Sequence, residues 1–366
     1  MQASRSEYAI DTSQKNAGPP LIRMGHPIAF TAFLRHIGAP VERYLRSQKL
    51  PVLCNDPNMF VPLTRAWSFF DAASRHEDEM LGWLVGAYAG DHNLNLGLLQ
   101  KLETAPTLFQ AMQWLVQKAR SEASHIQLGI LNRRTDVLLY THYSGMREVP
   151  GYSTAQAYQI GVMLGLIRHF LGQHWTPDEI GVEHSITPVV KEYLPGSRIL
   201  THQSVGYIAV PRTCLHQASP GTALKIAVAD NPVMTENFDY IDTLRAVLKS
   251  YLPDGYLSAR FVAAVMGVSE RTLARRLSAC GLTYRALIDE VRFTEAKKLL
   301  LNPDIRIEDV ALSVGFDGQG NFTRMFRRVS GLNPTEFRKT ALCAESQGES
   351  IHARQGGGFS KPVVTQ

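Results

Sequence analysis

The chain has 366 residues and 45% of them are hydrophobic, so it is long enough for two domains and can fill their cores. Its net charge is +5. Residues 241–340 carry 16 Lys and Arg against 11 Asp and Glu, so the whole positive excess lies in this segment. These values exclude a chain that is disordered overall, and they indicate a polyanionic partner for the C-terminal part.

The four cysteines lie far apart and form no CxxC pair, which argues against a disulfide framework or a zinc site. The first residues contain no apolar segment of the kind that a signal peptide needs. The most apolar helix-length stretch, residues 158–171, is too short to span a bilayer and contains Arg168 and His169. We therefore expect a cytoplasmic protein with no membrane partner, no metal and no cofactor.

The N-terminal part is expected to be an α+β domain, residues 21–217, preceded by a disordered N-terminus at residues 1–20. Helical spacing of apolar residues comes first, and the runs IQLGILN and VLLYTHYS then predict an antiparallel hairpin. A long helix is predicted at residues 153–171, followed by shorter strands. The expected fold is therefore helices plus an antiparallel sheet.

The segments on either side of the C-terminal domain have the composition of connecting chain. Residues 218–237 contain Ser-Pro-Gly and Asp-Asn-Pro and are expected to be a linker. Residues 341–366 are rich in Gly and Ser and are expected to be a mobile tail. The C-terminal domain then covers residues 238–340.

That domain is expected to be all-α, with two helix-turn-helix units joined by a long helix. The runs VAAVMGVSERTLARRL and VALSVGFDGQGNFTRMFRRV each predict an apolar helix, a Gly-containing turn, and a second helix with one apolar and one cationic face. Residues 283–301 between them predict one continuous helix, about 27 Å long at about 1.5 Å per residue. The two reading helices would then lie close to one DNA turn apart, about 34 Å, and a monomer would cover roughly twenty base pairs.

The first reading helix is predicted to begin at Ser269, a favourable N-cap residue. Its buried stripe is expected to be Leu273, Leu277 and Cys280. Arg271 and Arg275 lie one turn apart on another face, with Arg276 beside them, and this spacing suits guanine O6 and N7 or two successive phosphates. The alternative is a solvated cationic face that pairs with Glu270 and nearby acids.

The second reading helix is predicted to bury Phe322, Phe326 and Val329. Its opposite surface offers Gln319, Asn321, Thr323, Arg324, Arg327 and Arg328. Asn and Gln suit adenine N6 and N7, and Arg324 suits guanine or a phosphate. Arg327 and Arg328 lie near the helix C-terminus, where they complement the helix dipole and suit the phosphate backbone.

These C-terminal segments resemble the AraC/XylS family of bacterial transcription regulators. The matching pieces are SERTLARRL, DEVRFTEAKKLLL and IEDVALSVGFDGQGNFTRMFRRVSGLNPTEFR. The last piece has the family's alanine before the turn, Gly-Phe at the turn, and Gly-x-x-Pro-x-x-Phe-Arg after the reading helix. The resemblance implies a sequence-specific regulator of double-stranded promoter DNA, with RNA polymerase as a partner and activation as the usual mode.

The resemblance also places base-facing positions on Arg271, Ala274, Arg275, Gln319, Gly320, Asn321 and Arg324. Two of these depart from a polar reading surface, because Ala274 makes no polar contact and Gly320 has no side chain. Gly320 also lowers helix stability by roughly 0.5–1 kcal/mol relative to Ala. The complete set of candidate DNA-binding residues is Ser269, Arg271, Thr272, Ala274, Arg275, Arg276, Gln319, Gly320, Asn321, Thr323, Arg324, Arg327 and Arg328.

The N-terminal part is similar to the effector-binding half of one branch of this family, through LGLLQKLETAPTLFQAMQWL and the run from EIGVEHSITP to YIAVPRTCL. It implies a domain that senses a small molecule or forms a homodimer, but it identifies no effector-binding residues. A ligand-independent dimerisation module is an alternative. An enzyme is a weaker one, because the scattered histidines form no HxH or HExxH motif and no GxSxG or P-loop is present, so no catalytic residues are expected.

Overall fold

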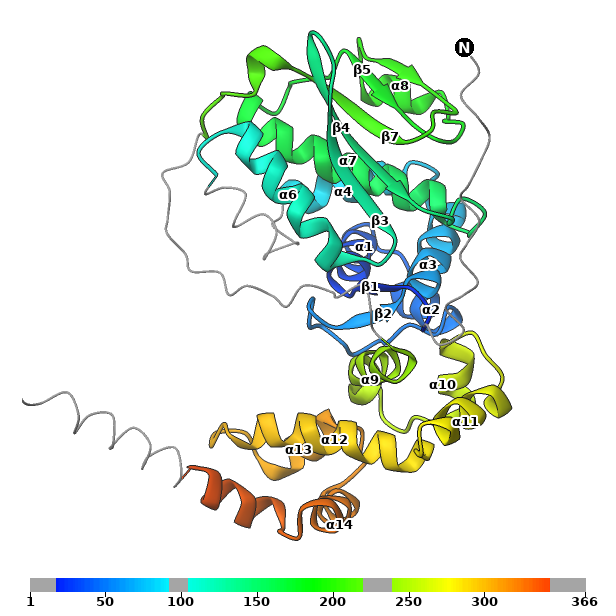
Figure 1. Cartoon of the computed structure of the whole chain (residues 1–366), viewed down its shortest axis with the longest axis vertical. Coiled ribbons are helices and arrows are strands. Elements are labelled where there is room, and N and C mark those ends of the chain that lie inside the picture. Colours follow the sequence, from blue (N-terminus) through cyan, green and yellow to red (C-terminus); the bar gives the residue numbers. More distant parts are fainter. Residues whose placement is uncertain (1–17, 92–104, 220–238, 343–366) are drawn as a thin grey trace, which may run out of the picture. The chain divides into compact units, whose positions relative to one another are not determined.

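The computed structural model describes residues 18–91, 105–219 and 239–342 (Figure 1). The predicted disordered N-terminus, linker and mobile tail lie almost entirely outside these residues.

The chain divides into two compact units. The first runs to Ser250 and also includes Ala263–Val268, and the second comprises Tyr251–Val262 and the residues from Ser269 onward. The first unit combines helices with antiparallel strands, and the second is helical among its described residues, which confirms the predicted α+β and all-α character of the two parts.

The described part of the first unit contains helices of very different length. They are α1 (Gly25–His36), α2 (Val41–Ser47), α3 (Leu63–His76), α4 (Leu81–Asp91), α6 (Leu108–Glu122), α7 (Tyr152–Leu171), α8 (Val189–Tyr193) and α9 (Tyr240–Tyr251), with a 3-10 turn η1 (Arg212–Cys214). Helix α7 begins one residue before its predicted start and ends at the predicted residue. Helix α6 begins after Thr107, whose side chain caps the helix by accepting from the backbone N–H of Gln110.

A five-stranded sheet has the order β3-β4-β7-β5-β6, and helices α6 and α7 pack against it (Figure 1). Its strands are β3 (Ile126–Asn132), β4 (Asp136–Tyr143), β5 (Glu179–Gly181), β6 (Arg198–Leu200) and β7 (Gly206–Pro211). The predicted β3–β4 hairpin is confirmed. The edge strand β6 was not predicted, and it runs parallel to β5. A separate pair of strands, β1 (Leu21–Arg23) and β2 (Phe60–Pro62), is antiparallel.

Helices α4 and α7 cross at glycines. A Cβ atom on Gly86 would lie 2.7 Å from both the Cα of Gly161 and the carbonyl oxygen of Tyr158. A Cβ on Gly82 would clash with the carbonyl oxygen of Thr154. The two backbones therefore approach more closely than any side chain would allow, and this crossing holds α4 against the helix that supports the sheet.

A buried carboxylate joins α7 to the sheet and the loops beside it. Glu183 accepts hydrogen bonds from Gln156 Nε2 at 2.8 Å, His142 Nδ1 at 3.0 Å and Arg147 Nε at 2.5 Å. Burial opposes ionisation of Glu183, but hydrogen bonding to His142 and the charge of Arg147 hold its pKa below the ordinary value.

Among the described residues no group of three or more His, Cys, Asp or Glu is arranged to hold a metal ion.

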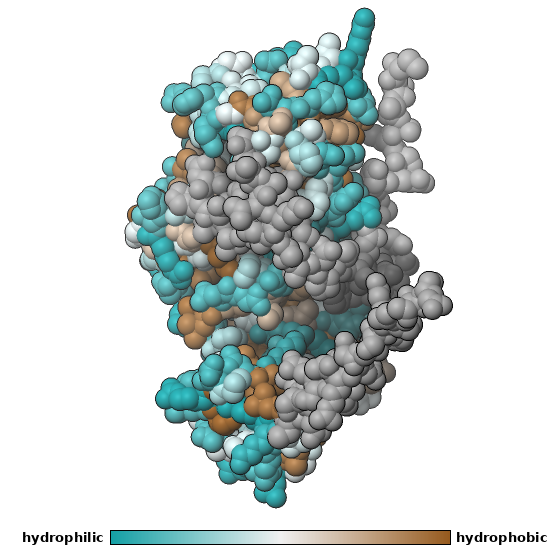
Figure 2. Space-filling model, turned by 90° about the vertical axis from the view of Figure 1, so that its left-hand side faces the viewer, coloured by the Kyte–Doolittle hydropathy of each residue, from teal (hydrophilic) through white to brown (hydrophobic). Residues whose placement is uncertain are grey.

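No helix in the described part of the chain is long and apolar enough to cross a membrane. On the face shown in Figure 2, hydrophilic residues cover most of the described surface and apolar residues appear as separate patches.

The second unit is built from short helices around one longer helix. Its elements are η2 (Leu252–Asp254), α11 (Glu270–Ala279), α12 (Tyr284–Leu300), α13 (Ile307–Ser313) and α14 (Gln319–Ser330), with α10 (Ala259–Val265) divided between the two units. Residues 334–342 are also helical. Helix α12 is the continuous helix predicted at residues 283–301, and Thr283 caps it by accepting from the N–H of Ala286 at 3.2 Å.

The turn between α13 and α14 is fixed by a glycine and by a buried arginine. Gly315 has a φ of +81°, and a Cβ there would lie 2.7 Å from the carbonyl oxygens of Leu252 and Gly255. Arg292 of α12 is only 7% exposed, and its Nη2 donates to the Gly315 carbonyl at 3.2 Å. Its guanidinium lies over the Phe316 ring, 4.5 Å from the ring centroid. Residue 315 must therefore be glycine, and the contacts of Arg292 from α12 hold the turn in place.

The prediction that Cys280 and Val329 are buried is wrong. Cys280 is exposed because α11 ends at Ala279, so its side chain follows the last helical residue. Val329 is 42% exposed, whereas Met325 is buried beside Phe322 and Phe326. The Phe326 ring already contacts Phe337 at a centroid distance of 5.4 Å, and the core ends there, before the last turn of α14.

We predict that Gly86→Ala destabilises the first unit by about 1–3 kcal/mol, because the added methyl overpacks the α4–α7 crossing. Urea unfolding followed by circular dichroism of the full-length chain measures the change. An unchanged unfolding midpoint would show that the crossing does not need glycine.

We predict that Gly315→Ala costs more stability than Gly267→Ala. Both glycines have positive φ, +81° and +71°, but a Cβ on Gly267 would meet no atom within 4 Å. The Gly267 variant should lose about 1–2 kcal/mol from the left-handed backbone alone, and the Gly315 variant about 1–3 kcal/mol more from the clash with two carbonyl oxygens. The same unfolding experiment compares them, and equal losses would contradict the clash.

Candidate nucleic-acid interface

Helix α11 presents a cationic face and a buried apolar one. Leu273 and Leu277 are buried, whereas Arg271, Ala274 and Arg275 are exposed. Neither Arg271 nor Arg275 forms a salt bridge or a side-chain hydrogen bond with another described residue. Neither arginine therefore pairs with Glu270, and both side chains are exposed.

Ser269 and Thr272 are occupied by the start of α11. The Ser269 hydroxyl accepts from the backbone N–H of Thr272 at 3.1 Å, and the two hydroxyl oxygens are 2.9 Å apart. This is an N-cap arrangement, which satisfies one of the first N–H groups of the helix. Arg276 is partly buried at the edge of the same helix. Of the predicted residues on α11, Arg271 and Arg275 are thus exposed, whereas Ser269 and Thr272 cap the helix and Arg276 is partly buried.

Helix α14 has the second cationic face. Six of its seven predicted residues are exposed and Thr323 is partly buried; the exposed ones are Gln319, Gly320, Asn321, Arg324, Arg327 and Arg328. Arg324 Nη2 donates to Asn321 Oδ1, so these two side chains act as a pair. A Cβ on Gly320 would meet no atom within 4 Å, so packing does not require a glycine there.

The two arginines at the end of α14 differ in their surroundings. Arg328 Nη2 lies 2.5 Å from Asp289 Oδ2 of α12. Arg327 is exposed and has no ion pair with the residues that the structure describes. The sequence predicted the same phosphate contact for both arginines, but only Arg328 pairs with a carboxylate.

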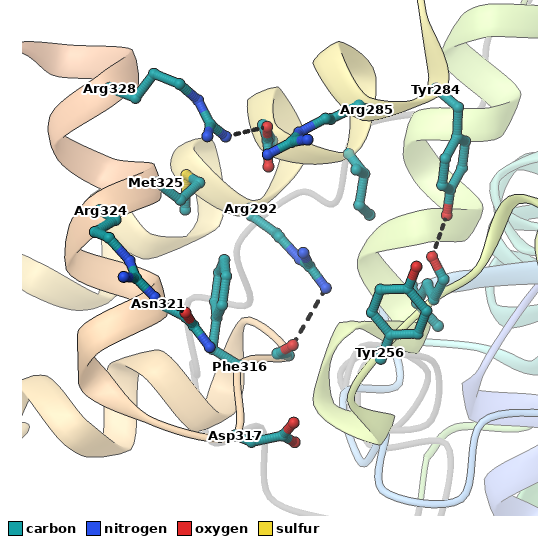
Figure 3. A pocket seen from close by; sticks show the side chains of 14 residues that line it. Tyr256, Tyr284, Arg285, Arg292, Phe316, Asp317, Asn321, Arg324, Met325 and Arg328 are labelled. Atoms are coloured by element: carbon teal, nitrogen blue, oxygen red, sulfur yellow. Dashed lines mark hydrogen bonds and ion pairs between the residues drawn. The ribbon is translucent and has the colours of Figure 1, made fainter.

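A cleft of about 710 Å³ lies between α12 and α14, and Figure 3 shows its side chains. Asn321, Arg324 and Arg328 line it from α14. Asp289 and Arg292 line it from α12. The predicted reading residues of α14 therefore share one concave, mainly cationic surface with α12.

Asp289 and Arg292 were not among the predicted site residues. Arg292 lies one helical turn after Ile288 and one turn before Ala296, and both of these are buried. Because Arg292 interrupts a stripe of apolar residues, the sequence could have predicted it as a buried cation with a structural role. Asp289 gave no such signal, because its pairing with Arg328 joins residues 39 positions apart.

Comparison with known proteins supports a nucleic-acid-binding domain at the C-terminus. A family profile described as a helix-turn-helix domain matches residues 262–340. The chain is 37% identical over 89 residues to the HTH-type transcriptional regulator VqsM of Pseudomonas aeruginosa, covering 24% of this chain and 27% of that protein. It is 32% identical over 96 residues to the transcriptional activator NphR of Rhodococcus sp, covering 26% and 29%. The chain thus spans little more than a quarter of the length of these relatives.

Solved structures with similarity include the transcriptional regulator CdpR of Pseudomonas aeruginosa, at 20% identity and a TM-score of 0.32, covering 81% of this chain and 96% of that one. The DNA-binding domain of AdpA, solved with a target DNA, is 27% identical with a TM-score of 0.27 and covers 29% and 96%. The family profile and the sequence relatives carry the assignment. Residues 262–340 are therefore a helix-turn-helix domain of the AraC type, similar in sequence to the domains of these transcription regulators.

Proposed function

We propose that this chain is a sequence-specific transcription regulator that reads promoter DNA with two helix-turn-helix units, whose reading helices are α11 and α14. The observation that carries the proposal is the pair of amphipathic helices in one unit. Each has an exposed cationic face, and Arg271 and Arg275 on α11 and Arg327 on α14 form no ion pair with another described residue. Arginine recognises both guanine edges and phosphates, so such faces suit a duplex.

On α11, Arg271 and Arg275 lie one helical turn apart with the small Ala274 beside Arg275. A small side chain lets the helix backbone approach the groove floor, and an alanine methyl can contact a thymine methyl. We infer that the two arginines take guanines or successive phosphates, while the Ser269 and Thr272 hydroxyls hold the start of the helix.

On α14, the Asn321 amide oxygen accepts one N–H of Arg324. The guanidinium retains further N–H donors for guanine O6 and N7, and its orientation is restricted before DNA arrives. Arg327, near the C-terminal end of the helix, is assigned to the phosphate backbone.

For residues 21–217 we propose a sensing role, in which a small molecule or a second copy of the chain alters DNA binding. Activation, with RNA polymerase as partner in the cytoplasm, follows from the family by analogy. A ligand-independent dimerisation module is the competing role, and Leu131 supports it, because this residue is 56% exposed on the sheet's edge strand β3. Sedimentation of the full-length chain, with and without candidate metabolites, separates the two roles.

The decisive experiment is selection of bound duplexes from a random DNA pool with the full-length protein at fixed salt. A motif with two elements about one helical turn, roughly 34 Å, apart supports two reading helices. A motif with a single element would reduce the proposal to one reading helix, and recovery of no motif would contradict sequence-specific reading.

We predict that Arg275→Ala and Arg324→Ala each lose about 1–3 kcal/mol of specific binding and relax the preference at one position of the motif. Lys298→Ala is the matched control, because Lys298 is an exposed cation of α12 that pairs with Glu295 at 3.0 Å. Fluorescence anisotropy on the selected duplex and on single-position variants measures both effects. Affinities equal to that of the control would remove the reading-helix assignment.

We predict that Arg327→Ala weakens binding to all duplexes alike and lowers the slope of log affinity against log salt by about one. Arg328→Ala should change that slope less, because Asp289 already neutralises its charge. Salt titrations of both variants provide the comparison. A base-selective loss for Arg327→Ala would show that it reads sequence instead.

A further inference from the structure

Arg292 is a buried cation with an incomplete set of partners. It is 7% exposed, and its Nη2 donates to the Gly315 carbonyl. Its Nε is buried and has no hydrogen-bond partner. The acid that acts on it most strongly is Asp289, whose carboxylate already lies 2.5 Å from Arg328. A buried charge without its own counter-ion is costly, so an anion placed beside Arg292 would be stabilised.

Arg292 lines the cleft of about 710 Å³, and Figure 3 shows its guanidinium directed at the turn that carries Phe316. This volume is in the range of small-molecule sites, roughly 300–1,000 Å³. The cleft is lined by four arginines and two aspartates, so its charge favours an anion. The arginines are Arg285, Arg292, Arg324 and Arg328, and the aspartates are Asp289 and Asp317.

Apolar and aromatic side chains complete the lining. Among them Ile288 and Met325 are buried, and Tyr256 is 80% exposed. The Tyr284 hydroxyl donates to the Leu257 carbonyl at 2.8 Å, which fixes the chain that carries Tyr256. A site with guanidinium donors and aromatic walls suits a small organic anion with a flat apolar body.

We propose that this cleft is a binding site for a small organic anion of the aromatic carboxylate type. The carboxylate lies beside the Arg292 guanidinium and among the other arginines of the lining, and the ring packs against the apolar part of the lining. The consequence for regulation rests on the proposed function: Asn321, Arg324 and Arg328 line the same cleft, so the bound anion competes with the duplex for α14.

A phosphate of the DNA backbone offers the same oxyanion chemistry, and the experiment separates the two sources. The full-length chain is titrated calorimetrically with sodium benzoate in the absence of DNA, at constant ionic strength. Benzamide is the uncharged isostere, and inorganic phosphate is the oxyanion without a ring. We expect saturable benzoate binding, with benzamide weaker by about tenfold or more because the charge-assisted hydrogen bond is lost. Phosphate should bind more weakly than benzoate, because it has no apolar body.

Four variants locate the site. Asp289→Asn should strengthen benzoate binding about threefold or more, because it removes a nearby negative charge. Tyr256→Ala should weaken it, and Arg292→Lys should weaken it about tenfold, because lysine keeps the charge but loses the fork of donors. Lys298→Ala, outside the cleft, should leave binding unchanged, and circular dichroism checks that each variant is folded.

The inference is overturned if the folded chain shows no saturable benzoate binding, if benzamide binds equally well, or if Asp289→Asn and Tyr256→Ala match the Lys298→Ala control. Duplex affinity is measured separately, with and without benzoate. Duplex binding without benzoate binding rejects the small-anion site alone and leaves the cleft to backbone phosphate. Benzoate binding without duplex binding rejects the proposed function alone.

Discussion

The contact of the buried Arg292 guanidinium with the turn before α14 is the interaction on which the position of α14 depends. It joins the long helix α12 to the turn before α14, through the Gly315 carbonyl and the Phe316 ring. Because a side chain at residue 315 would strike two carbonyl oxygens, the turn has little freedom to adopt another shape. The start of α14, and with it Gln319 and Asn321, is positioned by this contact.

Arginines of the second unit perform three different physical tasks. Arg292 is buried and structural, Arg328 is tied to Asp289, and Arg271, Arg275 and Arg327 have no ion pair with any described residue. The net positive charge of the second unit is therefore larger than the charge that its free arginines can offer to a polyanion. Binding to DNA would have to separate Arg328 from Asp289 or leave the pair intact, and either choice limits what that arginine adds to affinity.

Local periodicity was sufficient to predict α7, the β3–β4 hairpin, α12 and the amphipathic faces of α11 and α14, because these depend on neighbours a few residues apart. It failed where distant residues decide. Strand β6 exists because Arg198–Leu200 pairs with β5. Phe337, from the following helix, packs on Phe326, whereas Val329 is exposed. The candidate site shows the same limit, because residue type and spacing identified Arg324 but not its partnership with Asn321.

Gly315 and Gly320, five residues apart, show how the structure changes the meaning of a glycine. Gly315 is required by its positive φ and by two nearby carbonyl oxygens, whereas Gly320 faces open space in a regular helix. Packing therefore explains the first and not the second, although Gly320 lowers helix stability by roughly 0.5–1 kcal/mol. In the proposed function its effect is on recognition: without a side chain between Gln319 and Asn321, α14 makes fewer polar base contacts, and the Arg324–Asn321 pair carries most of its sequence preference.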